Sequence, residues 1–373
     1  MKEIRQAVQQ IQYSVRDISE RAASRDDVVR LDIGQPDFDS PDAAKQAAKD
    51  AIDRGRITYT SLWGIDELRE EIASFESHKA DYSHDNIMAT TGGIGALYCI
   101  FSTLCEPGEN IVFNDPCWSV YPMLANASTA ELRQVPYFDG GEVDVEAVEQ
   151  AVDEDTKALV VNSPENPTGR VYTRDEIEQL AGIAERNDLY LIGDEVYDRL
   201  TYGKDHVSVA EVAPERSLIV NSMSKNFAMT GWRLGWVAAD DPDLIHELGK
   251  VNRATTACPN FAAQHAALGA LRNSMDYVDE MRQEYAERKA LIEDELDRLG
   301  LDYVEPEGAI YIFPDVGRDS WEFAHDLLDE AGVSVVPGAP SGSDSSTNVR
   351  ICFGSVGQDA IRDGMQRLAD YLA

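Results

Sequence analysis

The chain has 373 residues, 43% of them hydrophobic, and chains of this length usually divide into two domains. Its 68 acidic residues outnumber the 33 basic ones and give a formal net charge of −35 at pH 7. So large an excess repels nucleic acid phosphates and anionic membrane surfaces, so we expect neither nucleic acid nor a membrane as a partner.

The acidic residues are spread along predicted helical faces, as in residues 279–297, and do not collect in one tail. Our hypothesis is that the protein comes from a halophile, in whose high-salt cytoplasm the repulsion between like charges is screened. We therefore expect a higher melting temperature in molar KCl than in dilute buffer. Equal melting temperatures would contradict the hypothesis.

The sequence shows no sign of a targeting segment or of a metal site. Residues 1–6 are polar, and no apolar run approaches the roughly 20 residues of a membrane-spanning helix. The expected location is therefore the cytoplasm. The five cysteines and six histidines are scattered without ligand spacing, so we expect no metal and no disulfide framework.

In chain order, the first 60 residues predict packing elements and two loops. Apolar residues at helical spacing indicate a helix within residues 1–30 and another over 43–54. Between them, Gly34 stands in a loop rich in Pro and Asp, where a glycine lets the backbone approach a ligand closely. Tyr59 follows in the next loop. Taken alone, the first loop is equally well an ordinary turn, and Tyr59 a structural side chain.

Short apolar runs separated by helices then predict an open parallel sheet. The run 235–239 returns too soon for a helical crossover, so it is expected to pair antiparallel. Ligands bind at the carboxyl ends of the strands in such sheets. Strands are expected at 87–90, 111–114, 158–162, 189–194 and 218–220, with helices at 96–104 and 174–187.

Residues after two of these strands suit a phosphorylated aldehyde. Lys225 is flanked by Ser, Asn, Met and Phe and is a candidate for a partly desolvated amine that forms a Schiff base. Ser222, Ser224 and Arg233 offer hydroxyl and guanidinium donors that match phosphate oxygens. The glycine-rich turn 91–95 frees backbone N–H groups for an anion at a helix start. An aldehyde that carries a phosphate suggests pyridoxal 5'-phosphate (PLP).

Two charged residues stand in or at the end of apolar strands. Asp194 closes its strand and needs a cation or a donor, such as a protonated pyridine nitrogen; the alternative is a helix cap. Arg350 lies inside an apolar strand and needs a bidentate anion; the alternative is an internal salt bridge. Around Arg350 we expect a smaller α/β unit with helices at 275–299 and 321–331, strands at 307–313 and 333–336, and a flexible loop at 337–347.

From about Leu31 to the C-terminus these strings resemble, in order, the class I and II aminotransferases, which are fold type I PLP enzymes. The resemblance implies an α/β fold in which a mostly parallel seven-stranded sheet lies between helices. It also implies a homodimer with shared active sites, in which Tyr59 reaches the cofactor phosphate of the neighbouring subunit. The domains expected are an N-terminal arm with part of the small domain (1–45), a large PLP-binding domain (46–275) and a small C-terminal domain (276–373).

The same resemblance assigns a role to each site residue. Lys225 holds PLP as an internal aldimine and moves the substrate α-proton, Asp194 faces the pyridine nitrogen, and Tyr197 donates to the ring oxygen. Gly34, Asn166 and Arg350 form the substrate site, with Arg350 on the α-carboxylate. The remaining cofactor contacts are Gly93, Ile94 and Gly95 at the phosphate, Trp118 on the ring, Asn166 at the ring oxygen, and Ser222, Ser224 and Arg233.

The implied reaction is transfer of the α-amino group of an L-amino acid to a 2-oxoacid by a ping-pong mechanism, with 2-oxoglutarate as the expected acceptor. The alternatives are a PLP-dependent carbon-sulfur lyase or another fold type I enzyme, and a non-catalytic PLP-binding regulator. Ile94 stands where some aspartate-specific relatives carry a lysine, so that route to acidic substrates is absent. Aromatic, branched and small neutral donors all stay open.

Overall fold

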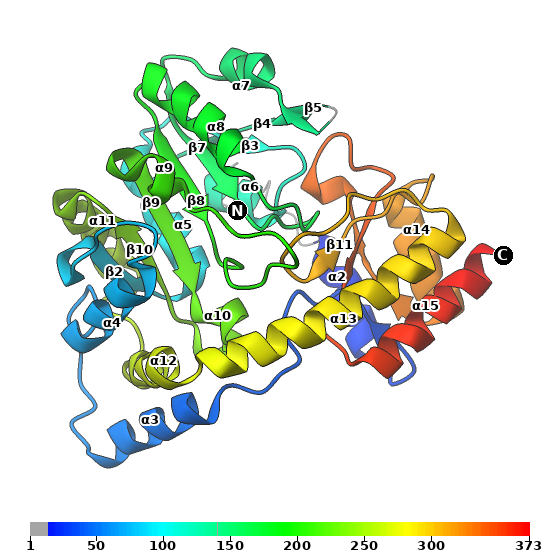
Figure 1. Cartoon of the computed structure of the whole chain (residues 1–373), viewed down its shortest axis with the longest axis horizontal. Helices are drawn as coiled ribbons and strands as arrows, with labels where there is room; N and C mark the ends of the chain where they lie inside the picture. The colour runs from blue at the N-terminus through cyan, green and yellow to red at the C-terminus, as the bar shows by residue number, and fades with distance from the viewer. Residues whose placement is uncertain (1–13, 140) are drawn as a thin grey trace, which may run out of the picture.

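The computed structural model describes residues 14–139 and 141–373, and Figure 1 shows the course of the chain. Its largest feature is a seven-stranded sheet in the order β2-β10-β9-β8-β7-β3-β4. All neighbouring strands are parallel except β10, which runs antiparallel to β2 and β9. This confirms the mostly parallel sheet and the antiparallel run at 235–239. The strands are β2 (Ile87–Thr90), β3 (Asn110–Asn114), β4 (Glu131–Val135), β7 (Thr156–Asn162), β8 (Tyr190–Asp194), β9 (Ser217–Ser222) and β10 (Gly235–Ala239).

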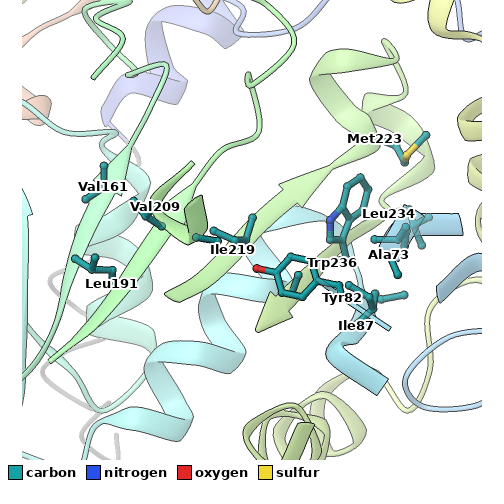
Figure 2. Packing of buried hydrophobic residues seen from close by; sticks show 14 of the residues in the cluster. Ala73, Tyr82, Ile87, Val161, Leu191, Val209, Ile219, Met223, Leu234 and Trp236 are labelled. Atoms are coloured by element: carbon teal, nitrogen blue, oxygen red, sulfur yellow. The ribbon is translucent and has the colours of Figure 1, made fainter. Parts of the chain in front are cut away.

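Helices cover both faces of this sheet, and every strand except the edge strand β4 is largely buried. In β7, Leu159 and Val161 pack into one hydrophobic cluster, while Ala158 and Val160 pack into another on the opposite face. Figure 2 shows Val161 with other side chains of the first cluster. That cluster includes side chains of α3 (Asp42–Asp53), α4 (Asp66–Glu76), α7 (Val145–Ala151), α8 (Arg174–Arg186), α9 (Val209–Val212) and α12 (Phe261–Asn273), and the other those of α5 (Gly92–Leu104), α6 (Val120–Ala127) and α11 (Pro242–Thr255).

A second core draws apolar side chains from both ends of the chain, such as Ile18 and Leu31 near the start and Met365 near the end. The long helix α13 runs from the large sheet along this core (Figure 1). We propose that this core forms the small domain, with the boundaries 1–45, 46–275 and 276–373 given above. Its elements are α2 (Ser14–Ala23), β1 (Val29–Arg30), α13 (Met275–Leu299), β11 (Tyr311–Ile312), α14 (Ser320–Asp326), a π-helical turn (Leu327–Ala331), β12 (Val333–Ser334), β13 (Val336–Pro337), β14 (Val349–Cys352) and α15 (Gln358–Leu372).

Short elements complete the fold. The helical ones are α10 (Met223–Asn226) and the 3-10 turns His84–Asn86, Pro214–Arg216, Thr230–Trp232 and Ala339–Ser341; β5 (Phe138–Asp139) and β6 (Glu142–Val143) pair as a small hairpin. No helix among the described residues is long and apolar enough to cross a membrane.

Several expected element boundaries were wrong. Helix α5 begins at Gly92 and not at residue 96, because burial of the apolar residues that follow outweighs the low helix propensity of its glycines. The strand expected over 307–313 is only Tyr311–Ile312, and the one expected over 333–336 is divided between β12 and β13. Of the helix expected within residues 1–30, the structure describes Ser14–Ala23, and residues 1–13 lie outside the described part.

Candidate active site

A cavity of about 360 Å³ lies where strands β7, β8 and β9 end, beside the start of α5 and strand β14. Of the predicted site residues, only Gly95 and Tyr59 do not line it. Gly95 lies in the first turn of α5, and Tyr59 is 89% exposed in the loop after α3. The predicted residues that line the cavity are Gly34, Gly93, Ile94, Trp118, Asn166, Asp194, Tyr197, Ser222, Ser224, Lys225, Arg233 and Arg350.

Lys225 projects from α10, the short helix that directly follows strand β9. The Ser222 hydroxyl caps this helix by accepting the backbone N–H of Ser224 at 3.3 Å, which fixes where the lysine leaves the chain. The Lys225 amine donates to the carbonyl oxygen of Gly34 and lies 5.5 Å from the centre of the Tyr197 ring. The amine is therefore held inside the cavity by groups without charge, as a nucleophile for an aldehyde requires.

The start of α5 and the Arg233 guanidinium form a part of the cavity wall that suits an anion. Gly93 and Ile94 belong to the first turn of α5, where backbone N–H groups have no intrahelical partner and favour an anion. Arg233 adopts a left-handed backbone conformation (φ 54°), and its guanidinium lies against Gly92. A Cβ atom at Gly92 would lie 2.5 Å from Arg233 Nη2, and Gly92 has a positive φ of 71°, so glycine suits this backbone and leaves the guanidinium its present place at the helix start.

Asp194 closes β8 and is 2% exposed. Its Oδ2 accepts the hydroxyl of Tyr121 at 2.7 Å, whereas its buried Oδ1 has no hydrogen-bond partner among the described residues. Burial raises the pKa of this carboxyl to about 6, although the Tyr121 hydroxyl lowers it in part. A buried carboxylate oxygen without a donor fits a protonated pyridine nitrogen, so the site suits PLP. Sequence reasoning missed Tyr121, which stands 73 residues from Asp194 and in no motif.

Arg350 and Asn166 form a second polar group in the cavity wall. Arg350 of β14 donates to Asn166 Oδ1 at 3.0 Å and to the backbone carbonyl of Asp32 at 3.1 Å. The Asn166 loop is fixed in turn by Asn162, which accepts its backbone N–H at 2.9 Å and donates to the Asp194 carbonyl at 2.9 Å. The described partners of the guanidinium are neutral oxygens, so its charge is available to a substrate carboxylate.

Comparison with known proteins agrees with this geometry. The sequence profile of "Aminotransferase class I and II" matches residues 26–368. The chain therefore belongs to the class I and II aminotransferase family. It is 37% identical to the aspartate/prephenate aminotransferase of Thermus thermophilus over 357 residues. This alignment covers 93% of this chain and 91% of that protein. It is also 34% identical to a probable N-acetyl-LL-diaminopimelate aminotransferase of Bacillus subtilis over 361 residues. This alignment covers 95% of this chain and 91% of that protein.

The fold agrees as well. The structure of the aspartate aminotransferase from Thermus thermophilus with maleate superposes with a TM-score of 0.94 at 34% identity, covering 99% of this chain and 100% of that one. The protein is thus a PLP-dependent aminotransferase of fold type I, which acts on amino acids and 2-oxoacids.

The raised pKa of Asp194 predicts how this aminotransferase responds to pH when it is prepared without PLP. The folded carboxyl titrates at about 6 and the unfolded one near 3.8, so the stability that its protonated form contributes is lost as the pH rises between these values. At pH 7 the cost is on the order of 3 kcal/mol. Thermal unfolding without PLP should therefore show Asp194→Asn to be more stable than the wild type at pH 7, by a margin that shrinks toward pH 5.

The same substitution should lower turnover by roughly 10²- to 10³-fold, because an amide cannot hold the charge of a protonated pyridine. A variant that is less stable than the wild type at pH 7 without PLP would contradict the account of this carboxyl.

Proposed function

We propose that the protein transfers the α-amino group of a neutral L-amino acid to a 2-oxoacid in the cytoplasm, with 2-oxoglutarate as the expected acceptor. The proposal rests on the charges around the cavity. Among the described residues that line it, the cationic side chains are Lys225, Arg233 and Arg350, and each has a task apart from the substrate side chain. The apolar residues Ile33, Ile94 and Leu97 also line it and suit a side chain without charge.

Each charged group then has one role. Arg350 and the amide of Asn166 hold the substrate α-carboxylate, since a guanidinium binds a carboxylate with two parallel hydrogen bonds. Arg233 and the start of α5 hold the cofactor phosphate. PLP, when bound, supplies the electron sink for the substrate carbanion. Asp194 keeps the pyridine nitrogen protonated, and Tyr197 donates to the ring oxygen.

Lys225 moves the proton. With PLP bound, this amine would hold the cofactor covalently and, once displaced by the substrate amine, would act as the base for the substrate α-proton and as the acid that gives a proton back. The short α10 helix and the carbonyl of Gly34 hold the amine inside the cavity, as this role requires.

We also propose that the enzyme is a homodimer. Ile57 and Tyr59 are 58% and 89% exposed in the loop after α3, and such side chains in one loop favour burial by another chain. In the dimer, Tyr59 reaches the cofactor phosphate of the neighbouring subunit, so each active site would need both copies.

A second candidate is an aspartate donor, because the Thermus thermophilus relative is named an aspartate/prephenate aminotransferase. The two candidates differ in what must bind the second carboxylate of the donor. A neutral donor needs no further cation, whereas the second carboxylate of aspartate would need one from outside the described residues of this cavity. The second carboxylate of 2-oxoglutarate has the same requirement, and pyruvate has none.

The test is kcat/KM for a panel of donors that includes leucine, phenylalanine, alanine, aspartate and glutamate, each with 2-oxoglutarate and with pyruvate as acceptor. We expect the neutral donors to react faster than aspartate. Ile94→Lys, which places a cation at a 40% exposed position of the cavity wall, should raise kcat/KM for aspartate by about 10- to 100-fold. A wild type that prefers aspartate, and a variant without effect, would favour the second candidate.

A further inference from the structure

One buried side chain of the cavity wall had no place in the sequence motifs. Tyr311 of β11 is 1% exposed and lines the cavity. We propose that Tyr311 is a positioning residue that holds both the substrate-carboxylate arginine and the cofactor-facing tyrosine, through its ring face and its hydroxyl respectively. This inference rests on the roles proposed above for Arg350 and Tyr197.

Strand pairing brings Tyr311 beside Arg350. Strands β11 and β14 are antiparallel, and Tyr311 stands opposite Cys352. Because side chains alternate along a strand, Arg350 points to the same face as Cys352 and is a diagonal neighbour of Tyr311. The guanidinium carbon of Arg350 lies 4.4 Å from the centre of the Tyr311 ring. The ring thus forms one wall for a guanidinium whose edge donates to Asn166 and to the Asp32 carbonyl.

The hydroxyl of Tyr311 makes the second contact. It lies 2.8 Å from the hydroxyl of Tyr197, and the two rings meet edge to face at 83°. Each phenol has one proton to donate. If the Tyr197 proton goes to the cofactor ring oxygen, the Tyr311 hydroxyl must be the donor between the two. Tyr311 then orients Tyr197 and strengthens it as a donor.

A third contact links Tyr311 to the Lys225 side of the cavity. A Cβ atom at Gly34 would lie 2.6 Å from the Tyr311 hydroxyl, so the phenol occupies the space that a side chain there would need. The carbonyl of the same Gly34 accepts the Lys225 amine. One phenol therefore touches the residues on which the carboxylate, the ring oxygen and the lysine depend.

Two substitutions separate the two contacts. Tyr311→Phe removes the hydroxyl and keeps the ring, whereas Tyr311→Leu removes both. Three quantities are measured: the dissociation constant of 3-phenylpropionate, an unreactive carboxylate, by calorimetry; the pH midpoint of the visible band of the PLP-loaded protein; and the melting temperature. Tyr202→Phe is the matched control, because the Tyr202 hydroxyl donates to the Ala309 carbonyl at 2.5 Å in the adjoining segment.

We expect Tyr311→Phe to leave the dissociation constant within about twofold and to raise the pH midpoint by about 0.5 to 1 unit. The midpoint rises because a weaker donor at the ring oxygen disfavours the deprotonated form. Tyr311→Leu should raise the pH midpoint by a similar amount and raise the dissociation constant of 3-phenylpropionate by about tenfold. Tyr202→Phe should change neither quantity.

An unchanged midpoint in Tyr311→Phe, or the same shift in Tyr202→Phe, would overturn the inference. Arg350→Met distinguishes this failure from failure of the proposed site. If Arg350→Met weakens the binding of 3-phenylpropionate but Tyr311→Leu does not, Tyr311 does not position the arginine. If Arg350→Met has no effect on binding, the proposed role of Arg350 is itself wrong.

Discussion

Lys225→Ala should lower kcat for amino transfer by at least about 10⁴-fold, the upper range for a positioned acid-base group. The expected loss is large because one amine has two tasks, to bind the cofactor covalently and to move the α-proton. The side chain projects from α10 into the cavity, toward the Gly34 carbonyl. Turnover is measured as 2-oxoacid formed from the best donor of the panel at saturating PLP.

Two further variants serve as controls for Lys225. Lys225→Arg keeps the charge, but a guanidinium stays protonated and does not attack an aldehyde, so it should be as inactive as the alanine variant. Lys204→Ala removes a lysine that is paired with Glu307 at 2.8 Å and does not line the cavity, and it should remain active. Turnover within about tenfold of wild type in Lys225→Arg would exclude the covalent role.

Lys79→Met should lower the free energy of unfolding by about 3–5 kcal/mol, the usual cost of removing one partner from a buried charge group. The Lys79 side chain is fully buried, and its amine lies 2.7 Å from Glu76, 3.0 Å from Glu195 and 2.6 Å from Asp198. Without the lysine these three carboxyl groups would remain together in the core. Urea unfolding followed by fluorescence measures the loss.

The pKa values show how much the cluster depends on Lys79. Burial raises the pKa of Glu76. At Glu195 burial acts in the same direction, but Lys79 and His206 together outweigh it and lower that pKa to about 2. A carboxyl with a depressed folded pKa stabilises the protein above its unfolded value near 4.5, and this contribution is lost as the pH falls toward 2. At neutral pH this stabilisation is fully present in the wild type, so the lower free energy of unfolding of Lys79→Met should be measurable there.

An exposed lysine provides the comparison for Lys79. Lys45 pairs with Asp39 and Asp42 at 2.8 Å, but both aspartates are exposed, so Lys45→Met should hardly change the urea midpoint. Equal midpoints for the Lys79 and Lys45 variants would contradict the prediction.

Loss of Lys79 should also affect the active site, because the cluster contacts chain neighbours of site residues. Glu195 and Asp198 are the chain neighbours of Asp194 and Tyr197. Asn221, which precedes Ser222, donates to Glu76 and Asp198 at 3.2 and 3.1 Å. Trp236, labelled in Figure 2, donates to Glu76 at 2.8 Å. The cluster thus connects the segments at the ends of β8 and β9.

The sequence predicted what depends on local pattern. The apolar runs located the strands, and Lys225 and Asp194 were found because each stands at a strand end, where a parallel sheet collects its ligand groups. Strand β4 was not predicted, since Glu131–Val135 is a partly exposed edge strand without an apolar run. The short strands of the smaller core were also predicted poorly, because pairing with distant residues sets their limits.

The residues that were missed act across long separations. Tyr311 and Tyr197 are 114 residues apart, and no spacing rule connects them. Lys79 follows Ser77 and His78, and this local pattern does not predict burial, yet tertiary packing buries its side chain. Such partners become visible only when the chain is folded.

The most direct test of the central claim is the visible absorbance of the PLP-loaded protein in high salt, recorded while an L-amino acid is added without any 2-oxoacid. We expect the visible band to disappear in wild type and to return when a 2-oxoacid is added, and we expect neither change in Lys225→Ala. A band that persists while pyruvate and ammonia accumulate would instead identify a lyase. Absence of any visible band after addition of PLP would contradict the assignment of this cavity as the cofactor site.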